Sequence, residues 1–380
     1  MIQLPEHLLY ALCFITSLII SLVSIPQIIL ISSRKRLFDV PDSDRKIHSR
    51  IVPNLGGVGI FFAFITTASL FIQPAAFVKW NFIIASSLLL FLTGIMDDMI
   101  SLSPSKKFLA QLLAALIVVG IADIRLTSLH GILGVHELSY WYSITFSIVG
   151  CIFITNAVNL IDGIDGLAAS IGTLSTGILG IFLAAFDNPG AACLAFSLMG
   201  AIIGFLRFNI APAKIFMGDT GSLLVGFMTA ILCIMFVNSY NPQTQLATLI
   251  HGEKGALVVA LSILFVPVFD SFRVFITRIV KGVSPFKADR THLHHYLLDL
   301  GFTHSRTVTI LITANILIIV VSLVTQDFNP NIGILGIFAL SVGLYSILYF
   351  MRKKRMINIK TANTKEFPLN KESRRKDEAI

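Results

Sequence analysis

Charged residues are scarce in this chain of 380 residues. Asp, Glu, Lys and Arg make up 13% of it, about half the share that is typical of soluble domains. Apolar residues make up 55%, and the mean hydropathy is +0.83. No polar stretch is long enough to bury a core of its own, which excludes a separate soluble domain and disfavours nucleic-acid binding. The composition therefore predicts a polytopic membrane protein.

Cysteine is also rare, and the sequence shows no internal repeat. The four cysteines all fall inside apolar segments without CxxC spacing: Cys13, Cys151, Cys193 and Cys233. This distribution favours ordinary packing over a disulfide framework or a metal site. The lack of a repeat disfavours the inverted-repeat architecture of many transporters.

Long apolar runs are what the chain has instead. A spanning helix needs roughly 20 mostly apolar residues. The segments that qualify have the approximate limits 7–31, 56–74, 80–96, 108–124, 141–160, 164–186, 190–208, 221–238, 255–279, 305–324 and 331–351. We predict an all-α fold of about eleven transmembrane helices over residues 1–351, followed by a basic, disordered cytoplasmic tail at 352–380. Pro267 should kink or break the ninth helix.

The basic residues predict the orientation of this bundle. With the N-terminus outside and the C-terminus in the cytoplasm, every Lys and Arg except Lys79, Arg125 and Lys254 lies on the cytoplasmic side. The net charge of +8 suits an inner face that meets anionic lipid headgroups or a phosphorylated substrate.

The unusual polar motifs gather on the same side. Asp97 and Asp98 end the third segment, where adjacent carboxylates repel each other unless a cation joins them. They are either a solvated helix end or a metal-dependent pair. In such a pair, one carboxylate holds Mg²⁺ and the other takes a proton.

Two further motifs combine carboxylates with glycines. "NLIDGIDG" places Asn159, Asp162 and Asp165 along one face of a helical turn, with glycines that leave room for a ligand. A simple polar turn is the alternative. "FMGDTGS" places Asp219 at the start of the eighth segment, as a helix cap or beside a bound phosphate. Phe216 lies three residues before Asp219. It either stacks on a base or is an ordinary core residue.

The fourth motif, "DRTHLHH", contains Arg290, His292, His294 and His295. Three histidines this close cannot all point one way from a regular helix. A cationic clamp for phosphates is therefore favoured over a zinc site.

Asp270 and Arg273 lie three residues apart in the ninth segment. They either neutralise each other within the membrane or serve the site. Acidic residues for Mg²⁺, glycines for close approach and basic residues for phosphates form one consistent set. The set indicates phosphoryl transfer on a phosphate-bearing substrate at the inner membrane surface.

These motifs resemble those of the polyprenyl-phosphate N-acetylhexosamine-1-phosphate transferases, over about residues 34–310. The matches, in order, are "PNLGG" at 53–57, the pair Asp97–Asp98, "NxxDGIDGL" from Asn159, "FMGDTGS" from Phe216 and "HLHH" from His292. The "SPF" and "DR" before "HLHH" resemble the branch that starts O-antigen and other cell-surface polysaccharides. "PNLGG" and "HLHH" depart from the pattern of the peptidoglycan branch.

The resemblance implies a multi-pass enzyme of the bacterial inner membrane. Such an enzyme transfers N-acetylglucosamine 1-phosphate from UDP-GlcNAc to undecaprenyl phosphate and releases UMP. Its implied cofactor is Mg²⁺, with Mn²⁺ as an alternative ion. Another UDP-N-acetylhexosamine donor and, less favoured, a membrane transporter stay open as alternatives, as does a homodimer.

It also implies roles for individual residues. Asp97 would deprotonate the lipid phosphate, Asp219 would bind Mg²⁺ directly, and Asp98 would support the ion or its water shell. The implied substrate contacts are Asn159, Asp162 and Asp165 around the nucleotide and metal, Asn209 and Phe216 near the uracil, Lys106 or Lys107 at the diphosphate, and Arg290, His292, His294 and His295 at the sugar and phosphates.

Overall fold

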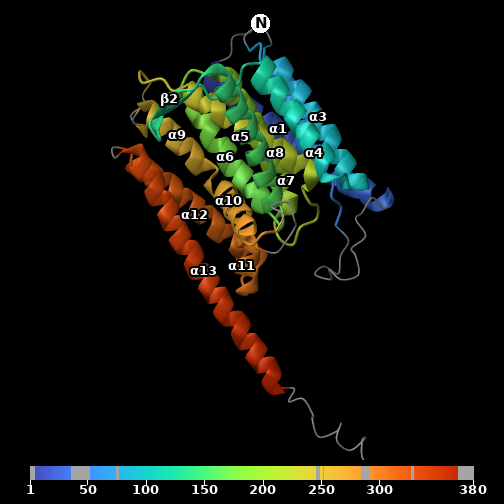
Figure 1. The fold of residues 1–380 in the computed structure, drawn as a ribbon. Helices are drawn as coiled ribbons and strands as arrows, with labels where there is room; N and C mark the ends of the chain where they lie inside the picture. Colours follow the sequence, from blue (N-terminus) through green and yellow to red (C-terminus); the bar gives the residue numbers. More distant parts are fainter. Residues whose placement is uncertain are drawn as a thin grey trace, which may run out of the picture.

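The computed structural model describes residues 5–35, 52–73, 77–244, 249–250, 252–283, 291–326 and 329–366. In this part of the chain nearly all regular structure is helical, and the helices lie together in one bundle (Figure 1). The predicted all-α membrane fold is confirmed.

The helices follow the predicted apolar segments closely. They are α1 (Glu6–Lys35), α2 (Gly56–Phe71), α3 (Trp80–Ile100), α4 (Pro104–Ala115), the π-helix η1 (Leu116–Ile121), α5 (Tyr140–Ile161), α6 (Leu167–Ala185), α7 (Pro189–Asn209), α8 (Gly218–Asn238), α9 (Gly252–Ile263), α10 (Phe265–Val280), α11 (Leu293–Asp299), α12 (His304–Val324) and α13 (Pro330–Glu366). Among the described residues, nine helices are long and apolar enough to cross a membrane, counting α4 with η1 as one, and α9 with α10 forms a tenth, bent span. The second predicted segment falls on α2, whose 16 residues are fewer than the roughly 20 of a simple span.

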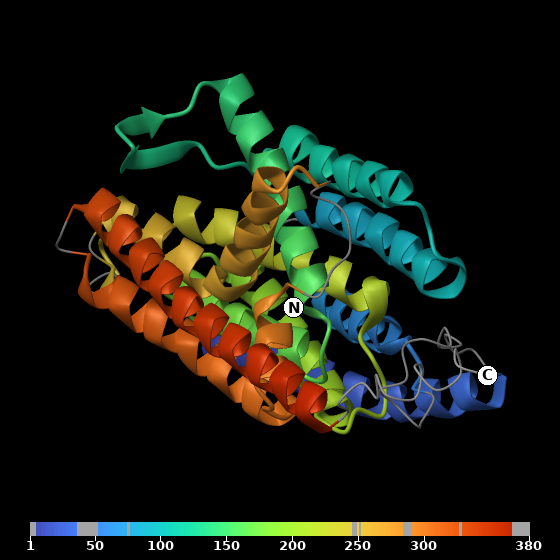
Figure 2. The same ribbon diagram turned by 60° about the horizontal axis from the view of Figure 1, so that its bottom comes forward.

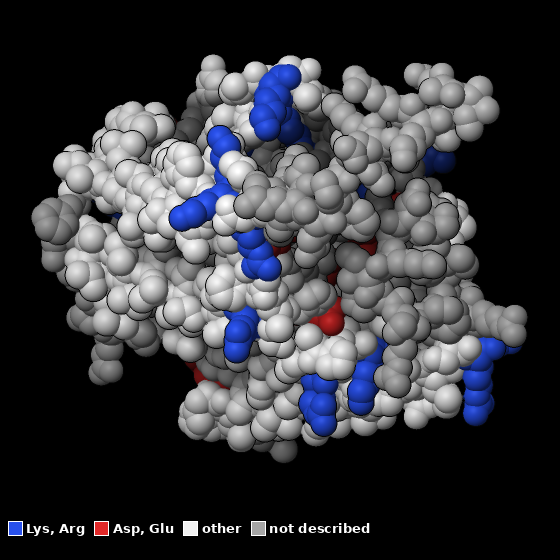
Figure 3. Space-filling model, turned by 90° about the horizontal axis from the view of Figure 1, so that it is seen from below, with Lys and Arg blue, Asp and Glu red and all other residues white. Residues whose placement is uncertain are grey.

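The two ends of the bundle differ in character. At the lower end in Figure 1, α3 ends and α8 begins; we call it the inner end, because the Lys and Arg distribution predicts that it faces the cytoplasm. Figure 3 views this end, where Lys and Arg side chains spread over the described surface and acidic ones show as small patches. At the other end, β1 (Ser128–Ile132) and β2 (Val135–Glu137) pair antiparallel and project from the bundle (Figure 2).

Helix α8 is the core of the bundle. Of its apolar window, 94% is buried, against 11–67% for the other long helices. It packs against α2, α3, α5, α6 and α9. Because neighbours enclose α8 on all sides, the position of its first turn is fixed relative to the inner ends of those helices.

The predicted break in the ninth segment is confirmed, but it lies at Leu264 rather than at Pro267. Helices α9 and α10 meet there at an angle of 72°. A proline ring clashes with the carbonyl four residues earlier, which here belongs to Ile263, so the helix stops before the proline. Pro267 itself lies in the first turn of α10, where its missing N–H is not needed.

The C-terminal helix extends beyond its predicted limit. α13 continues through Glu366, so the prediction of a disordered tail from Arg352 is wrong for residues 352–366, and its remainder lies outside the described residues. Figures 1 and 2 show α13 beside α12. Arg352 pairs with Asp299 of α11 at 2.5 Å, and packing against α11 therefore supports the helix past the apolar segment.

Candidate active site

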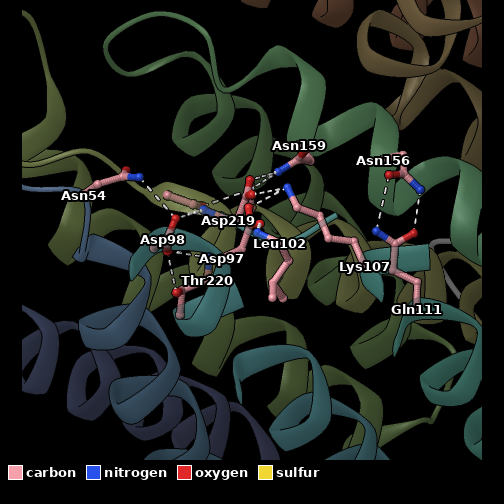
Figure 4. A network of polar contacts seen from close by, with 12 residues as sticks. Asn54, Asp97, Asp98, Leu102, Lys107, Gln111, Asn156, Asn159, Asp219 and Thr220 are labelled. Atoms are coloured by element: carbon pink, nitrogen blue, oxygen red, sulfur yellow. Dashed lines mark hydrogen bonds and ion pairs between the residues drawn. The ribbon is translucent and has the colours of Figure 1, made fainter. Parts of the chain in front are cut away.

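The inner ends of α3, α4, α5 and α8 meet, and one polar side chain from each joins a common network (Figure 4). Asp97 comes from the last turn of α3 and Lys107 from the first turn of α4. Asn159 comes from the last turn of α5, and Asp219 from the first turn of α8. Residues that are far apart in the sequence thus converge at one point of the inner end.

Lys107 joins the two carboxylates of this network. Its Nζ lies 2.6 Å from Asp97 Oδ2 and 2.5 Å from Asp219 Oδ2. Asn159 Nδ2 donates to the other oxygen of Asp219 and, at 2.8 Å, to Ser222 Oγ. The side chains of Asp97 and Asp219 remain 10% and 22% exposed, so a ligand can still reach them.

Asp98 has different surroundings, although it adjoins Asp97 in the chain. Its Oδ1 accepts from the backbone N–H of Asp219 at 2.7 Å and from Asn54 Nδ2 at 3.1 Å. Its Oδ2 accepts from the N–H of Thr220 at 3.0 Å and from Thr220 Oγ1 at 2.6 Å. Asp98 therefore caps the N-terminus of α8 from another helix, and four donors occupy the lone pairs that a metal ion would need.

Glycines allow this close approach between α8 and its neighbours. A side chain at Gly94 of α3 would begin 2.5 Å from the Cα of Thr220. Gly218 has a φ of +70°, and a Cβ there would lie 2.6 Å from Asp98 Oδ2. The "PNLGG" motif adds backbone contacts, because the N–H groups of Gly56 and Gly57 donate to Phe216 O and Met217 O at 2.9 and 2.8 Å.

The loop between α5 and α6 carries two carboxylates with different roles. Asp162 is half-buried; burial raises its pKa well above the ordinary value, and the carboxylates of Asp219 and Asp98 raise it further. Asp165 is buried, and its Oδ2 accepts from the N–H of Ala213 at 3.0 Å. Asp162 thus faces the acidic network, whereas Asp165 fixes the loop that leads to α8.

Asn209 and Phe216 also belong to that loop region. Asn209 is buried; its Oδ1 accepts from the N–H of Gly166 at 3.0 Å and its Nδ2 donates to Ile215 O at 2.9 Å. Its amide is therefore engaged with backbone groups on both sides. Phe216 is half-buried, and its backbone pairs with the "PNLGG" segment.

The histidines lie on and just before α11, close to the same loop. His292 Nδ1 lies 3.0 Å from Asp270 Oδ2, and Asp270 also accepts from the N–H of Leu293 and from Arg273, the latter at 2.6 Å. Asp270 and Arg273 thus form the predicted ion pair and, in addition, hold the start of α11. His295 is half-buried, with its ring centroid 4.2 Å from that of His294.

His294 is the buried histidine of this group. It is 2% exposed, both of its ring nitrogens lack a hydrogen-bond partner in the described part of the chain, and burial lowers its pKa to about 3. A Cβ at Gly163 would lie 2.6 Å from its Nε2, so the ring packs directly on the "DGIDG" loop. His294 is therefore a neutral group at physiological pH.

Three residues remain to be compared with the sequence predictions: Lys106, Arg290 and Asn54. Lys106 is exposed, whereas Lys107 is in the network. Arg290 lies outside the described residues. Asn54 belongs to the "PNLGG" motif, but the sequence did not indicate its contact with Asp98, since the two residues lie 44 positions apart.

The donor set fits a hard divalent cation such as Mg²⁺, which prefers carboxylate and amide oxygens. Lys107 already holds a positive charge between Asp97 and Asp219, and the carboxylates of Asp219 and Asp98 add to the rise that burial causes in the pKa of Asp162. Among the described residues no three His, Cys, Asp or Glu side chains surround one point, so Lys107 and the carboxylates would adjust to an ion.

Comparisons with known proteins agree with this chemistry. Residues 80–237 match the family described as glycosyl transferase family 4. The chain is 29% identical to a probable undecaprenyl-phosphate N-acetylglucosaminyl 1-phosphate transferase of Bacillus subtilis, covering 87% of this chain and 88% of that protein. It is 31% identical to an undecaprenyl-phosphate alpha-N-acetylglucosaminyl 1-phosphate transferase of Salmonella typhi, covering 81% and 82%. It is 30% identical to a decaprenyl-phosphate N-acetylglucosaminephosphotransferase of Mycobacterium tuberculosis, covering 79% and 78%.

Proposed function

Because the chain belongs to glycosyl transferase family 4, we propose that it transfers N-acetylglucosamine 1-phosphate from UDP-GlcNAc to undecaprenyl phosphate. An oxygen of the lipid phosphate attacks the phosphorus that carries the sugar. The bond from this phosphorus to the oxygen shared with the other phosphate breaks, and UMP leaves with the electron pair. The products are undecaprenyl-diphospho-GlcNAc and UMP.

The observation that carries the proposal is the network in which Lys107 joins Asp97 and Asp219. Lys107 contacts both carboxylates directly. Asp97 can accept a proton, Asp219 can hold a cation, and the ammonium of Lys107 can bind phosphate oxygens. Phosphoryl transfer needs this set of functional groups, since its catalysis depends on positioning the reactants and stabilising charge.

Asp97 is the proposed base for the lipid phosphate. Its carboxylate is fixed by Lys107 and by the N–H of Leu102, which donates to Oδ1 at 2.5 Å. An incoming phosphate offers Lys107 a new anionic partner, so the ammonium can turn from the carboxylates to the diphosphate. Asp97 then has a free oxygen for the proton of the lipid phosphate.

Asp219 is the proposed metal ligand, with Asp162 and Asn159 beside it. A bound Mg²⁺ would neutralise phosphate oxygens and stabilise the charge that develops on the leaving UMP. The four donors on Asp98 favour a supporting role for this residue, through the backbone of Asp219, over direct metal ligation.

The remaining residues are proposed to bind the donor. Asn209 and Asp165 shape the nucleotide site by holding the loops around Phe216, and the ring of Phe216 is the candidate for stacking on uracil. His292, His294 and His295, with Arg290, would contact the sugar and phosphates. His294 fits this role because its unpaired ring nitrogens can donate to and accept from hydroxyl groups.

The proposed location is the bacterial inner membrane, with the site facing the cytoplasm. A soluble nucleotide sugar then reaches the site from the aqueous side, while the lipid phosphate arrives at the same depth from the bilayer. The basic residues of the inner end support this placement (Figure 3).

The test is UMP release by the purified full-length protein given undecaprenyl phosphate, Mg²⁺ and UDP-GlcNAc. We expect release that requires both the lipid and the ion. Asp97→Asn should lower it by about 10²-fold or more, as loss of a key charged group does. Asp187→Asn, the same change in an exposed loop between α6 and α7, is the matched control and should leave it unchanged.

The outcomes separate the alternatives. Release with a different UDP-N-acetylhexosamine, but not with UDP-GlcNAc, would keep the chemistry and replace the donor. No release with any such donor in the presence of lipid and Mg²⁺ would overturn the proposal.

A further inference from the structure

Gln111 of α4 and Asn156 of α5 form an amide pair beside the network (Figure 4). Asn156 Nδ2 donates to Gln111 Oε1 at 2.6 Å, and Gln111 Nε2 donates back to Asn156 Oδ1 at 3.3 Å. Asn156 Nδ2 also donates to the carbonyl of Ile152, one turn earlier in its own helix, at 2.8 Å. The pair is therefore a two-point contact with a defined direction between the helices.

The pair is partly buried between the two helices, with Asn156 half-buried. Gln111 is 2% exposed, and both residues lie within membrane-spanning helices. Replacing both partners of a buried hydrogen bond by apolar groups of similar shape is nearly neutral for stability. A stable contact between α4 and α5 therefore does not require these two amides, and their presence needs another reason.

The register of the two helices supplies that reason. Lys107 lies four residues before Gln111 on α4, and Asn159 lies three residues after Asn156 on α5. Residues at these spacings share one helix face. Lys107 and Asn159 are also the two residues that bind the opposite oxygens of Asp219.

Helix α4 has little else to fix its position along α5. Phe108, Leu109 and Leu113 on its other face are 44–55% exposed, and the π-helix η1 follows directly after Ala115. Apart from the ion pairs of Lys107 itself, the further described polar contact of α4 to a neighbouring helix is from Ser86 of α3 to the carbonyl of Ala114, at 3.1 Å. Apolar contacts tolerate a small slide, whereas a paired amide does not.

We propose that Gln111 and Asn156 are positioning residues for the transfer reaction: their amide pair fixes the register of α4 on α5, so that Lys107 and Asn159 hold Asp219 from its two sides. This role rests on the proposed function, because it concerns the same site. The residues act through Lys107 and Asn159 and touch neither substrate.

The test uses two double variants of the full-length protein. Gln111→Leu with Asn156→Leu removes both amides, and we expect kcat to fall about tenfold to a hundredfold, as a small misplacement of catalytic groups does. The KM for undecaprenyl phosphate should stay within about twofold, because the lipid does not contact the pair. Gln111→Asn with Asn156→Gln exchanges the amides and should recover most of the lost kcat.

Ser86→Ala is the matched control, since it removes a polar contact of α4 that involves neither Lys107 nor the amide pair. It should leave kcat unchanged. A double-leucine variant within about twofold of the parent kcat, an exchange variant without recovery, or an equal loss in Ser86→Ala would each overturn the proposal.

Hydrogen exchange of the α4 backbone provides a readout that does not depend on activity. The amides of residues 107–111 should exchange faster in the double-leucine variant than in the parent or in Ser86→Ala. If the parent released no UMP with any donor, the proposed function would fail, and this exchange experiment alone would decide whether the pair holds α4. Unchanged exchange would then overturn the pair's role.

Discussion

Asp97 and Asp98 show how adjacent identical residues take different parts in one site. Asp97 contacts Lys107 and faces the place where a ligand can reach it, whereas Asp98 accepts four hydrogen bonds that hold the first turn of α8. Replacing one oxygen by an amide N–H₂ therefore has different consequences at the two positions.

Asp98→Asn should lower both stability and activity, because an amide would face donors that now point at an oxygen. We expect the free energy of unfolding to fall by about 1–3 kcal/mol, as an unsatisfied buried group does. Asp97→Asn should lose activity without this loss. Thermal unfolding in detergent with UMP release checks both variants, and equal thermal midpoints for the two would contradict the capping role.

Gly163→Ala tests the contact between the "DGIDG" loop and His294 of α11. Its Cβ would begin 2.6 Å from His294 Nε2, so the ring must move and activity should fall about tenfold, as a displaced binding group does. Gly150→Ala is the matched control, since no atom lies within 4 Å of the added Cβ. Similar UMP release by both variants would show that the position of His294 does not matter.

At the scale of elements, the break between α9 and α10 is held by one residue of α12. Asn315 is fully buried; its Nδ2 donates to Ile263 O and its Oδ1 accepts from the N–H of Val266, both at 3.0 Å. These are the carbonyl and the N–H that the break leaves without helical partners. Asn315 thus makes a bent span possible inside an apolar bundle.

Asn315→Leu should destabilise the protein by about 2–5 kcal/mol, since it leaves a buried carbonyl and a buried N–H unpaired. Heating followed by size-exclusion chromatography measures the loss of folded protein. Asn238→Leu, the same change at an exposed asparagine, should have a small effect. If the two variants lost folded protein at the same temperature, Asn315 would not hold the break.

The sequence predicted the elements better than their contacts. The eleven apolar runs are recognised by length and composition. Pro267 indicates a break in the ninth run, and the structure has this break at Leu264. The partners of Asp98 and Asn315 are not recognised in this way, since they lie in other helices and polar residues such as Asn54 have no periodic signal. The extension of α13 was missed because a run of charged residues resembles a solvated tail until a packing partner is known.

At the scale of the whole molecule, α13 braces the helix that carries the histidines. The guanidinium carbon of Arg352 lies 4.1 Å from the ring centroid of Tyr296, and the same side chain pairs with Asp299. Arg273, which also contacts Asp270, lies 4.4 Å from the ring centroid of Tyr345. Helix α13, the last of the described helices, is therefore tied to the site by cationic side chains and aromatic rings.

Arg352→Ala should weaken this brace by about 1–2 kcal/mol, the combined size of an ion pair and a cation–π contact. A less firmly held α11 should raise the KM for the sugar nucleotide about fivefold, since its histidines are the proposed donor contacts. Lys353→Ala, at the exposed neighbouring position, should leave that KM unchanged. An unchanged KM in Arg352→Ala would show that α11 keeps its position without the brace.

The cap that Asp98 provides joins residues that are synthesised at different times. Asp98 is made 122 residues before Thr220, so it has Asn54 as a donor but lacks its three donors from the start of α8 until that helix has been translated and inserted. The acidic part of the site is then complete at Ser222, whereas α11 and α13 still have to follow. Lys107 is already present at that stage. It is therefore the positive charge that allows the acidic half of the site to assemble in a nascent chain before the histidines exist.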